Sequence, residues 1–226
     1  MTGEAGERGQ RTDPIVQWPD APVPQMIDIA FELHGDTLAR DYQLGLWDAV
    51  MARLPWLAEA PFAGLHPLRV PATLDARVLL PARAKLVLRV PVARAEDAMA
   101  LAQSTLEVCG DPLHVGASRS KPLYPHPTVH ADFVLAQRPD ETVDETGFHA
   151  GVAQLLSLEG KPPAHICGRM KSIRVGSRTL HGAAVVVHGL RPAQSLQWQY
   201  AGLGAGRHFG CGLMVPHKNI SGLDQE

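Results

Sequence analysis

A glycine-rich stretch near residue 205, with the sequence GLGAGRHFGCGLMVP over residues 202–216, contains the residue types that could bind an anion. Glycines let main-chain N–H groups approach a ligand without a Cβ in the way, and successive N–H groups in a turn form an anion-binding concavity. An arginine and a histidine inside the stretch would add positive charge. The candidate phosphate contacts are therefore Gly202, Gly204, Gly206, Arg207 and His208.

The spacing of these glycines does not fit a nucleotide-binding loop. A G-x-G-x-x-G pattern would need a glycine where Phe209 or Arg207 stands, and no Lys-Ser or Lys-Thr pair directly follows a glycine as in a Walker loop. Too few residues follow the stretch to complete a βαβ unit. We therefore expect a bound phosphate to belong to a polymer, and we expect no cofactor.

The distribution of charge also favours a polyanion. The net charge is only −2, yet residues 161–218 contain lysines and arginines without a single acid. A basic region in a nearly neutral protein predicts a local binding surface for a polyanion. The candidate contacts in residues 168–178 are Arg169, Lys171, Arg174 and Arg178.

The histidines and cysteines do not predict a metal site. His126 and His130 have an i, i+4 spacing, but Pro125 and Pro127 make that segment extended, so the rings would diverge. The three cysteines lie far apart and read as small buried side chains. The chain has one H-x-T motif and no second H-x-[ST], so it does not match the two-histidine phosphoesterases.

The composition is that of an ordinary globular protein, with 226 residues, 45% of them hydrophobic and 19% charged. No stretch approaches the length of uninterrupted apolar sequence that a membrane span needs, and no signal peptide is evident. We therefore expect a cytoplasmic protein that does not contact a membrane.

The predicted strands and helices that position these residues follow the same order in both halves of the chain. Residues 1–25 are predicted to be a flexible leader and residues 218–226 a tail, with two halves between them at 26–124 and 125–217. Hydrophobic periodicity and turn residues predict a β-α-β-β-α-β order in each half, which indicates an α+β fold of duplicated ferredoxin-like units. The predicted strands and helices are, in the first half, strand 26–33, helix 41–54, strands 77–81 and 84–92, helix 93–108 ending at Gly110, and strand 112–124; in the second, strand 128–137, helix 144–160 ending at Gly160, a hairpin of 164–175 and 178–190 around Gly176, helix 191–202 and strand 211–216.

This plan, with a glycine-rich loop before the last strand, resembles the RAMP superfamily of CRISPR-associated proteins. Within it, the segment IDIAFELHGDTLARDYQLGLWDAVMARLPWL followed by GLHPL is similar to the Cas6 endoribonucleases, in particular the branch called Cmx6. The resemblance covers residues 26 to 217. It implies a metal-independent enzyme that cuts the repeats of precursor CRISPR RNA. Its expected partner is the repeat RNA, folded as a stem-loop, and other Cas effector subunits are further candidate partners.

The resemblance also implies a mechanism and its residues. The 2′-hydroxyl would attack the adjacent phosphorus and leave a 2′,3′-cyclic phosphate, which requires a base, an acid and positive charge at the non-bridging oxygens. His66 of GLHPL matches its motif position and is the first candidate, with His34 next. Tyr42 stands where the Cmx6 pattern has a histidine after the aspartate, and is expected to help His66 in the proton transfer.

Other interpretations of these residues remain open at the level of sequence. A histidine beside a proline is often a hydrogen-bonded structural residue, and Tyr42 lies on an apolar helix face where it could pack in the core. A subunit that holds CRISPR RNA without cutting it would have the same fold and the same glycine-rich loop.

Overall fold

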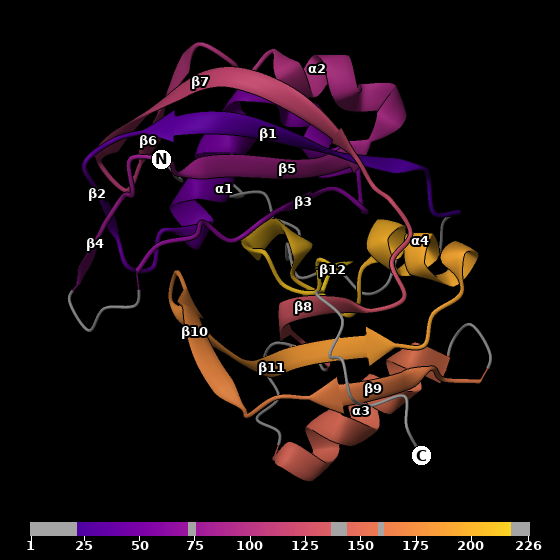
Figure 1. Cartoon of the computed structure of the whole chain (residues 1–226). Helices are drawn as coiled ribbons and strands as arrows, with labels where there is room; N and C mark the ends of the chain where they lie inside the picture. The colour runs from indigo at the N-terminus through magenta and orange to yellow at the C-terminus, as the bar shows by residue number, and fades with distance from the viewer. Residues whose placement is uncertain (1–21, 72–75, 137–143, 158–160, 218–226) are drawn as a thin grey trace, which may run out of the picture.

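Two antiparallel sheets, one from each half of the chain, organise the computed structural model, which describes residues 22–71, 76–136, 144–157 and 161–217. Figure 1 shows the first half above the second, with the segment coloured gold to yellow between them. Most of the predicted leader, the predicted tail and the helix end expected at Gly160 lie outside the described residues.

The first half contains a five-stranded sheet in the order β3-β5-β1-β7-β6. Strand β1 forms because its apolar side chains alternate, and Ile29, Phe31 and Leu33 are buried on the face that packs against α1 and α2. The elements of this half are β1 (Met26–His34), β2 (Thr37–Ala39), α1 (Gln43–Arg53), η1 (Pro55–Glu59), β3 (Gly64–Leu65), β4 (Arg77–Leu79), β5 (Lys85–Pro91), η2 (Val92–Arg94), α2 (Ala95–Met99), β6 (Ser104–Val108) and β7 (Asp111–Pro122).

The helix predicted over residues 93–108 is wrong in its second part. Only the first part is helical, in η2 and α2, and residues 104–108 form strand β6, which pairs with β7. Cys109 and Gly110 join the two strands with φ of 54° and 86°, as in the tight turns that suit antiparallel hairpins. Gly110 is therefore a hairpin residue rather than a helix end. The burial of Leu106 and Val108, which alternate with exposed neighbours, outweighs the helical composition of the segment.

The strand predicted over 77–81 exists as β4 but does not join the main sheet. It pairs with β2 in a separate two-stranded sheet. The position beside β5 is occupied by β3, a two-residue strand in the motif GLHPL. With β3 in that place, β3-β5-β1-β7 has the strand order of a ferredoxin-like unit, and β6 is an addition at its edge.

The second half follows the predicted order more closely. Its sheet has the order β10-β11-β8-β12, with β9 also paired to β11, and the hairpin turn falls at Gly176, as predicted. The α+β, ferredoxin-like fold is thus confirmed, while the boundary at residues 124 and 125 stays a prediction. The elements are β8 (Val129–Val134), α3 (Glu145–Ser157), β9 (Ala164–Cys167), β10 (Lys171–Val175), β11 (Arg178–His188), α4 (Pro192–Ala201), η3 (Arg207–Phe209) and β12 (Val215–Pro216).

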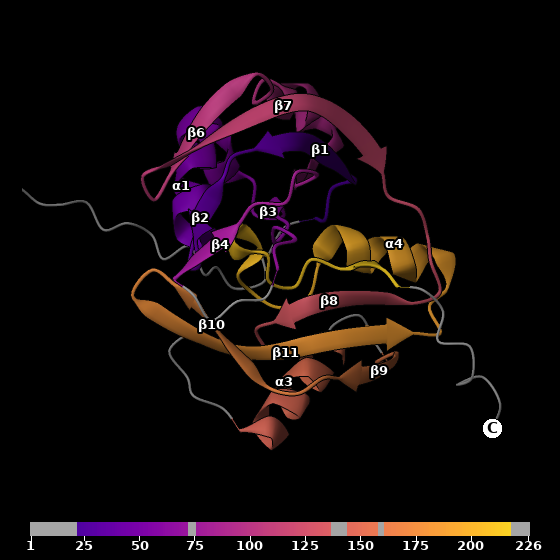
Figure 2. The ribbon, with the colours of Figure 1, turned by 60° about the vertical axis from the view of Figure 1, so that its left-hand side comes forward.

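The two halves share a hydrophobic core. Phe133, Leu135, Leu180, Phe209 and Cys211 from the second half belong to the same buried cluster as the side chains of β1 and α1. In Figures 1 and 2, α4 and the yellow glycine-rich segment lie between the two sheets, whereas α3 covers the far side of the second sheet. None of the helices in the described part of the chain is long and apolar enough to cross a membrane.

We predict that Gly204→Ala destabilises the protein far more than Gly189→Ala. Both glycines have left-handed backbones, with φ of 74° and 71°, but a Cβ at Gly204 would lie 2.2 Å from the carbonyl oxygen of Leu135, whereas nothing lies within 4 Å of one at Gly189. The left-handed conformation alone costs an alanine about 1–2 kcal/mol, and the clash should raise the loss at Gly204 to about 2–5 kcal/mol. Urea denaturation of both variants measures the difference, and equal losses would contradict it.

Candidate active site

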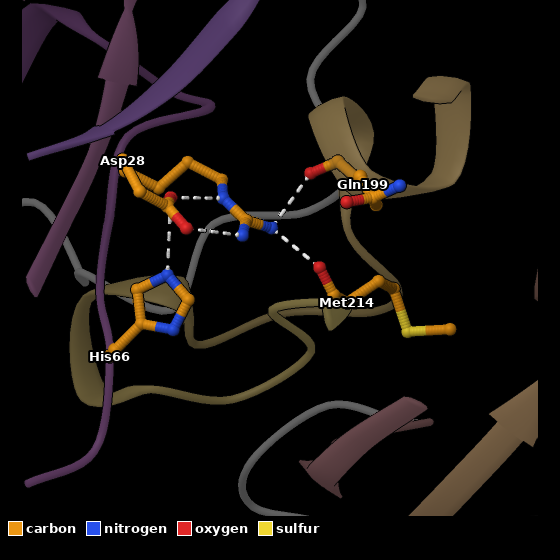
Figure 3. A network of polar contacts seen from close by, with 5 residues as sticks. Asp28, His66, Gln199 and Met214 are labelled. Carbon is orange, nitrogen blue, oxygen red and sulfur yellow. Dashed lines mark hydrogen bonds and ion pairs between the residues drawn. The ribbon is translucent and has the colours of Figure 1, made fainter. Parts of the chain in front are cut away.

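His66 lies at the end of the short strand β3, with one ring nitrogen held by a carboxylate. Its backbone N–H donates to the Val87 carbonyl at 2.9 Å, and its Nε2 lies 3.3 Å from Oδ1 of Asp28 (Figure 3). The His66 side chain is 15% exposed. No hydrogen bond to its other ring nitrogen, Nδ1, is found among the described residues. The first candidate from the sequence is thus an oriented histidine with one nitrogen left for another partner.

A fully buried arginine, Arg89 of β5, completes the network around Asp28. Its Nε and Nη2 donate to the two carboxylate oxygens of Asp28 at 2.7 and 3.0 Å. Its Nη1 donates to the backbone carbonyls of Gln199 and Met214 at 2.9 and 2.7 Å (Figure 3). Asp28 and Arg89 face each other across β1 and β5, whereas the two carbonyls belong to α4 and the segment before β12. One guanidinium group therefore joins the two halves of the chain.

The network sets the protonation of its members. Burial alone would raise the pKa of Asp28, but the hydrogen bond from His66 and the charge and hydrogen bonds of Arg89 hold it well below its usual range. Burial lowers the pKa of His66; the Asp28 hydrogen bond and charge oppose this shift, and the charges of Arg89 and Lys121 add to it. At neutral pH the ring is therefore neutral, donates Nε2–H to the ionised Asp28, and has a lone pair on Nδ1 that can accept a proton.

The hydroxyl of Tyr42 does not lie at a surface rim. Tyr42 is 4% exposed, and its hydroxyl oxygen accepts a hydrogen bond from the backbone N–H of Leu68 at 2.9 Å. Burial raises the pKa of this hydroxyl to about 12, with the hydrogen bond from Leu68 acting in the opposite direction. Tyr42 therefore fixes the segment just after His66 to the start of α1.

His34 is remote from this network. Its side chain is 55% exposed, its Nε2 lies 4.0 Å from Glu32, and its ring stacks on His114 with centroids 6.3 Å apart. His34 and Asp28 are six residues apart on one strand, a distance of about 20 Å. The structure therefore does not bring His34 and His66 to the same place.

The glycine-rich stretch is buried, which corrects the expectation of an open phosphate cradle. Gly202, Gly204 and Gly206 are buried with φ between 72° and 79°. The backbone of this stretch is hydrogen-bonded within the protein: the Leu203 N–H donates to the Gly212 carbonyl at 2.8 Å, and the Gly212 N–H donates to the Phe133 carbonyl at 2.7 Å. The glycines are needed because the chain approaches itself closely, which selects the same residue type as the approach of a ligand would.

Arg207 and His208 also contact the protein itself. Arg207 is 5% exposed, its guanidinium donates to the Ala201 carbonyl and lies 5.9 Å from the ring of Phe62, and burial lowers its pKa to about 10. The His208 ring stacks on Trp47 of α1 with centroids 4.1 Å apart and planes 9° apart. These two side chains therefore pack the loop against the first half.

The loop lies directly against the His66 motif. A Cβ on Gly64 would meet the carbonyl oxygen of Arg207 at 3.1 Å, and a Cβ on Gly210 would meet Pro67 at 2.6 Å. Glycines on both sides thus allow the two segments to pack closely, one residue pair on each side of His66. The two sequence motifs therefore lie together, through contacts within the protein.

The predicted basic surface of the second half is exposed but divided between two faces. Arg169, Lys171, Arg174 and Arg178 are all exposed. Lys171 pairs in register with Gly182 and points to the same face as Ile173, with its Nζ 5.7 Å from the Phe133 ring, whereas Arg174 points to the opposite face. An RNA that contacts both must follow the edge of the β10–β11 hairpin.

Asp28 and Arg89 were missed by sequence reasoning, although each carries a signal. Asp28 is an acid within an alternating strand, MIDIAFEL, and Arg89 is a base within the apolar run KLVLRVPV. A charge at such a position must be paired or exposed, because burying it alone is costly. Among the described residues, no group of three or more His, Cys, Asp or Glu could hold a metal ion.

Comparisons with known proteins agree on one family. The Cas6 family model, "Cas6 Crispr", matches residues 27–219. A CRISPR-associated endonuclease Cas6 of Myxococcus xanthus (strain DK1622) is 30% identical over 190 residues, which is 84% of this chain and 81% of that relative. A solved "CRISPR associated protein Cas6" is similar in fold, with a TM-score of 0.63 at 13% identity, over 86% of this chain and 100% of that one. A solved "RAMP protein binding different RNA substrates" has a TM-score of 0.56 at 13% identity, over 83% of this chain and 98% of that one.

We predict that Arg89→Met lowers the free energy of unfolding by about 3–5 kcal/mol, because it leaves Asp28 and two carbonyls without their buried donor. Arg77→Met is the matched control, since Arg77 forms an ion pair with Asp111 while its side chain is 52% exposed. Its loss should stay within about 1 kcal/mol. Urea denaturation measures both, and similar losses would contradict the central role of Arg89.

We predict a loss of stability on mild acidification that depends on His66. Because the folded pKa of His66 is lowered, the unfolded chain binds the proton more tightly, so stability falls as the pH drops below the unfolded value of about 6.5 towards the folded pKa. His66→Asn should remove this decline. Asp28 adds a separate loss only below about pH 4, because its folded pKa is depressed. Urea midpoints of parent and variant at pH 7.5, 6.5 and 5.5 test the difference, and parallel curves would contradict it.

Proposed function

The chain belongs to the Cas6 family, and from this premise we propose that it is an endoribonuclease that binds CRISPR repeat RNA and cuts precursor CRISPR RNA into mature guides. The Myxococcus relative is named an endonuclease, and this chain covers most of its length. A fold neighbour, Cse3 of Thermus thermophilus, was solved with an RNA representing a pre-cleavage complex, with a TM-score of 0.51 and 13% identity over 84% of this chain and 98% of that one.

The Asp28–His66 pair is the observation that carries a proposal for the chemistry. Nδ1 of neutral His66 takes the proton from a 2′-hydroxyl, and the resulting oxygen attacks the adjacent phosphorus. The bond from phosphorus to the 5′-oxygen breaks, that oxygen takes up a proton from water, and His66 then returns its proton to the solvent. The products are a 2′,3′-cyclic phosphate and a 5′-hydroxyl, without a metal ion. Asp28 keeps the ring in the required tautomer and stabilises the imidazolium that forms.

The other candidates receive different roles. We propose Tyr42 as a positioning residue, since its hydroxyl is bonded to the backbone two residues after His66. We propose a structural role for Gly202, Gly204, Gly206 and Arg207, which are buried. His34 is too far from His66 to share its phosphate.

We propose that repeat RNA follows the exposed cations of the β10–β11 hairpin, namely Arg169, Lys171, Arg174 and Arg178. Proteins recognise double-stranded RNA mainly through its phosphates and its shape, and an exposed row of lysines and arginines can contact those phosphates. Lys171 of this hairpin and Arg69 both act on Asp132: their charges help to lower its pKa, after the larger effect of its hydrogen bond to His130 and against burial. Arg69, three residues after His66, thus lies in the same basic neighbourhood.

We predict that His66→Ala cuts repeat RNA about 10²–10⁴ times more slowly than the parent while binding it nearly as well. The reason is that the substitution removes the proton acceptor and leaves the exposed cations in place. Single-turnover cleavage in EDTA measures the rate, analysis of the product ends tests for the cyclic phosphate, and melting curves show that the variant is folded. The parent rate should rise with pH and level off above the lowered pKa of His66.

Two control variants sharpen this test. His34→Ala should cut at the parent rate, and Tyr42→Phe should lose less activity than His66→Ala because its ring still packs. Full activity of His66→Ala would assign the proton transfer to another residue. A parent protein that binds its repeat tightly and never cuts it would support a subunit that holds CRISPR RNA without cleaving it.

A further inference from the structure

A groove on the first sheet has no role in the chemistry described above. It has a volume of about 590 Å³ and crosses β5, β1 and β7. The groove opens on the face of the sheet opposite to α1 and α2. Ile29 and Phe31 of β1 pack against these helices and therefore point away from the groove. The lining residues include Glu32, Lys85, Ser118, Arg119, Lys121 and Tyr124.

Strand register places three cations together on this face. Glu32 is opposite Lys85, Ala30 is opposite Arg119, and Asp28 is opposite Lys121. Residues opposite each other point to the same side of a sheet, and so do residues two apart on one strand. Lys85, Arg119 and Lys121 are all exposed, and none forms an ion pair with a described acid. The groove therefore presents three cations against the single acid Glu32.

An aromatic ring stands at one end of the groove on a fixed backbone. Tyr124 is 68% exposed, which is unusual for a large side chain. Its backbone carbonyl accepts a hydrogen bond from Nε2 of Gln199 at 2.8 Å, so the ring projects from an anchored position. An exposed ring beside unpaired cations is the combination that binds a single nucleic acid strand, because the ring stacks on a base while the cations contact phosphates.

We propose that this groove binds a single-stranded segment of the RNA substrate, with Lys85, Arg119 and Lys121 on its phosphates and a base stacked on Tyr124. The inference rests on the proposed function, because it takes RNA as the ligand. A volume of about 590 Å³ suits one or two nucleotides and is too small for a duplex. The bases of a duplex are stacked on one another and are not available to the ring. Lys121 lies opposite Asp28, so the bound strand leads towards the His66 pair.

The test is a titration of a fluorescein-labelled single-stranded RNA of about ten nucleotides, taken from the unpaired part of the repeat. For Arg119→Ala/Lys121→Ala we expect a Kd about ten times that of the parent, and a salt dependence shallower by about 1.4 in log–log slope, because two phosphate contacts are lost. The matched control is Arg83→Ala/Lys161→Ala, which removes two exposed cations outside the groove and should change neither value. Tyr124→Ala should weaken binding roughly 5- to 100-fold without changing the slope, while Tyr124→Phe retains affinity.

Two outcomes would overturn the proposal. Equal Kd values and slopes for the groove variant and its control would do so, and would leave this face of the sheet to a protein partner. An equal loss for a blunt RNA hairpin would overturn the preference for single strands. Neither result tests the role of His66, because cleavage by the parent is measured separately. A parent that never cuts would contradict the proposed function, but the binding titration of the groove variants would still be interpretable.

Discussion

The buried guanidinium of Arg89 is the constraint on which the arrangement of the two halves depends. A charge without exposure to solvent is tolerated only when every donor has an acceptor. Asp28 supplies two acceptors from the neighbouring strand, and the carbonyls of Gln199 and Met214 supply two more, so each of the three donor nitrogens has an acceptor. Gln199 lies in the last turn of α4, where carbonyls have no partner within the helix, so Arg89 also caps that helix and complements its dipole.

The same interaction explains why His66 is oriented. Asp28 cannot rotate, because both of its oxygens are bound to Arg89, and His66 meets a carboxylate with a fixed direction. The glycine-rich segment supports this geometry from the other side, since Gly210 packs against Pro67, next to His66. The loop and the histidine motif, far apart in the sequence, are thus parts of one packed unit.

The sequence predicted the elements that depend on neighbouring residues, and it predicted less well the features that depend on contacts between distant parts of the chain. Alternation predicted β1 and the hairpin at Gly176, because burial of one face dictates the spacing of apolar residues. The segment 104–108 was misread, because its composition suits a helix and only its pairing with β7 makes it a strand. The ion pair of Asp28 and Arg89 spans 61 residues, and no local pattern identifies such partners. His66 was predicted through its motif, whereas the buried glycines were interpreted as a phosphate site because a tight backbone and a bound phosphate select the same residue.

The long separation between Arg89 and its carbonyl partners has a consequence for synthesis on the ribosome. Gln199 and Met214 follow Arg89 by 110 and 125 residues, so the first sheet emerges well before the acceptors that complete it. During that interval Arg89 can pair only with Asp28, and the face that later meets α4 is open to solvent. The first half is therefore incomplete during translation, and its open face is accessible to chaperones or to RNA.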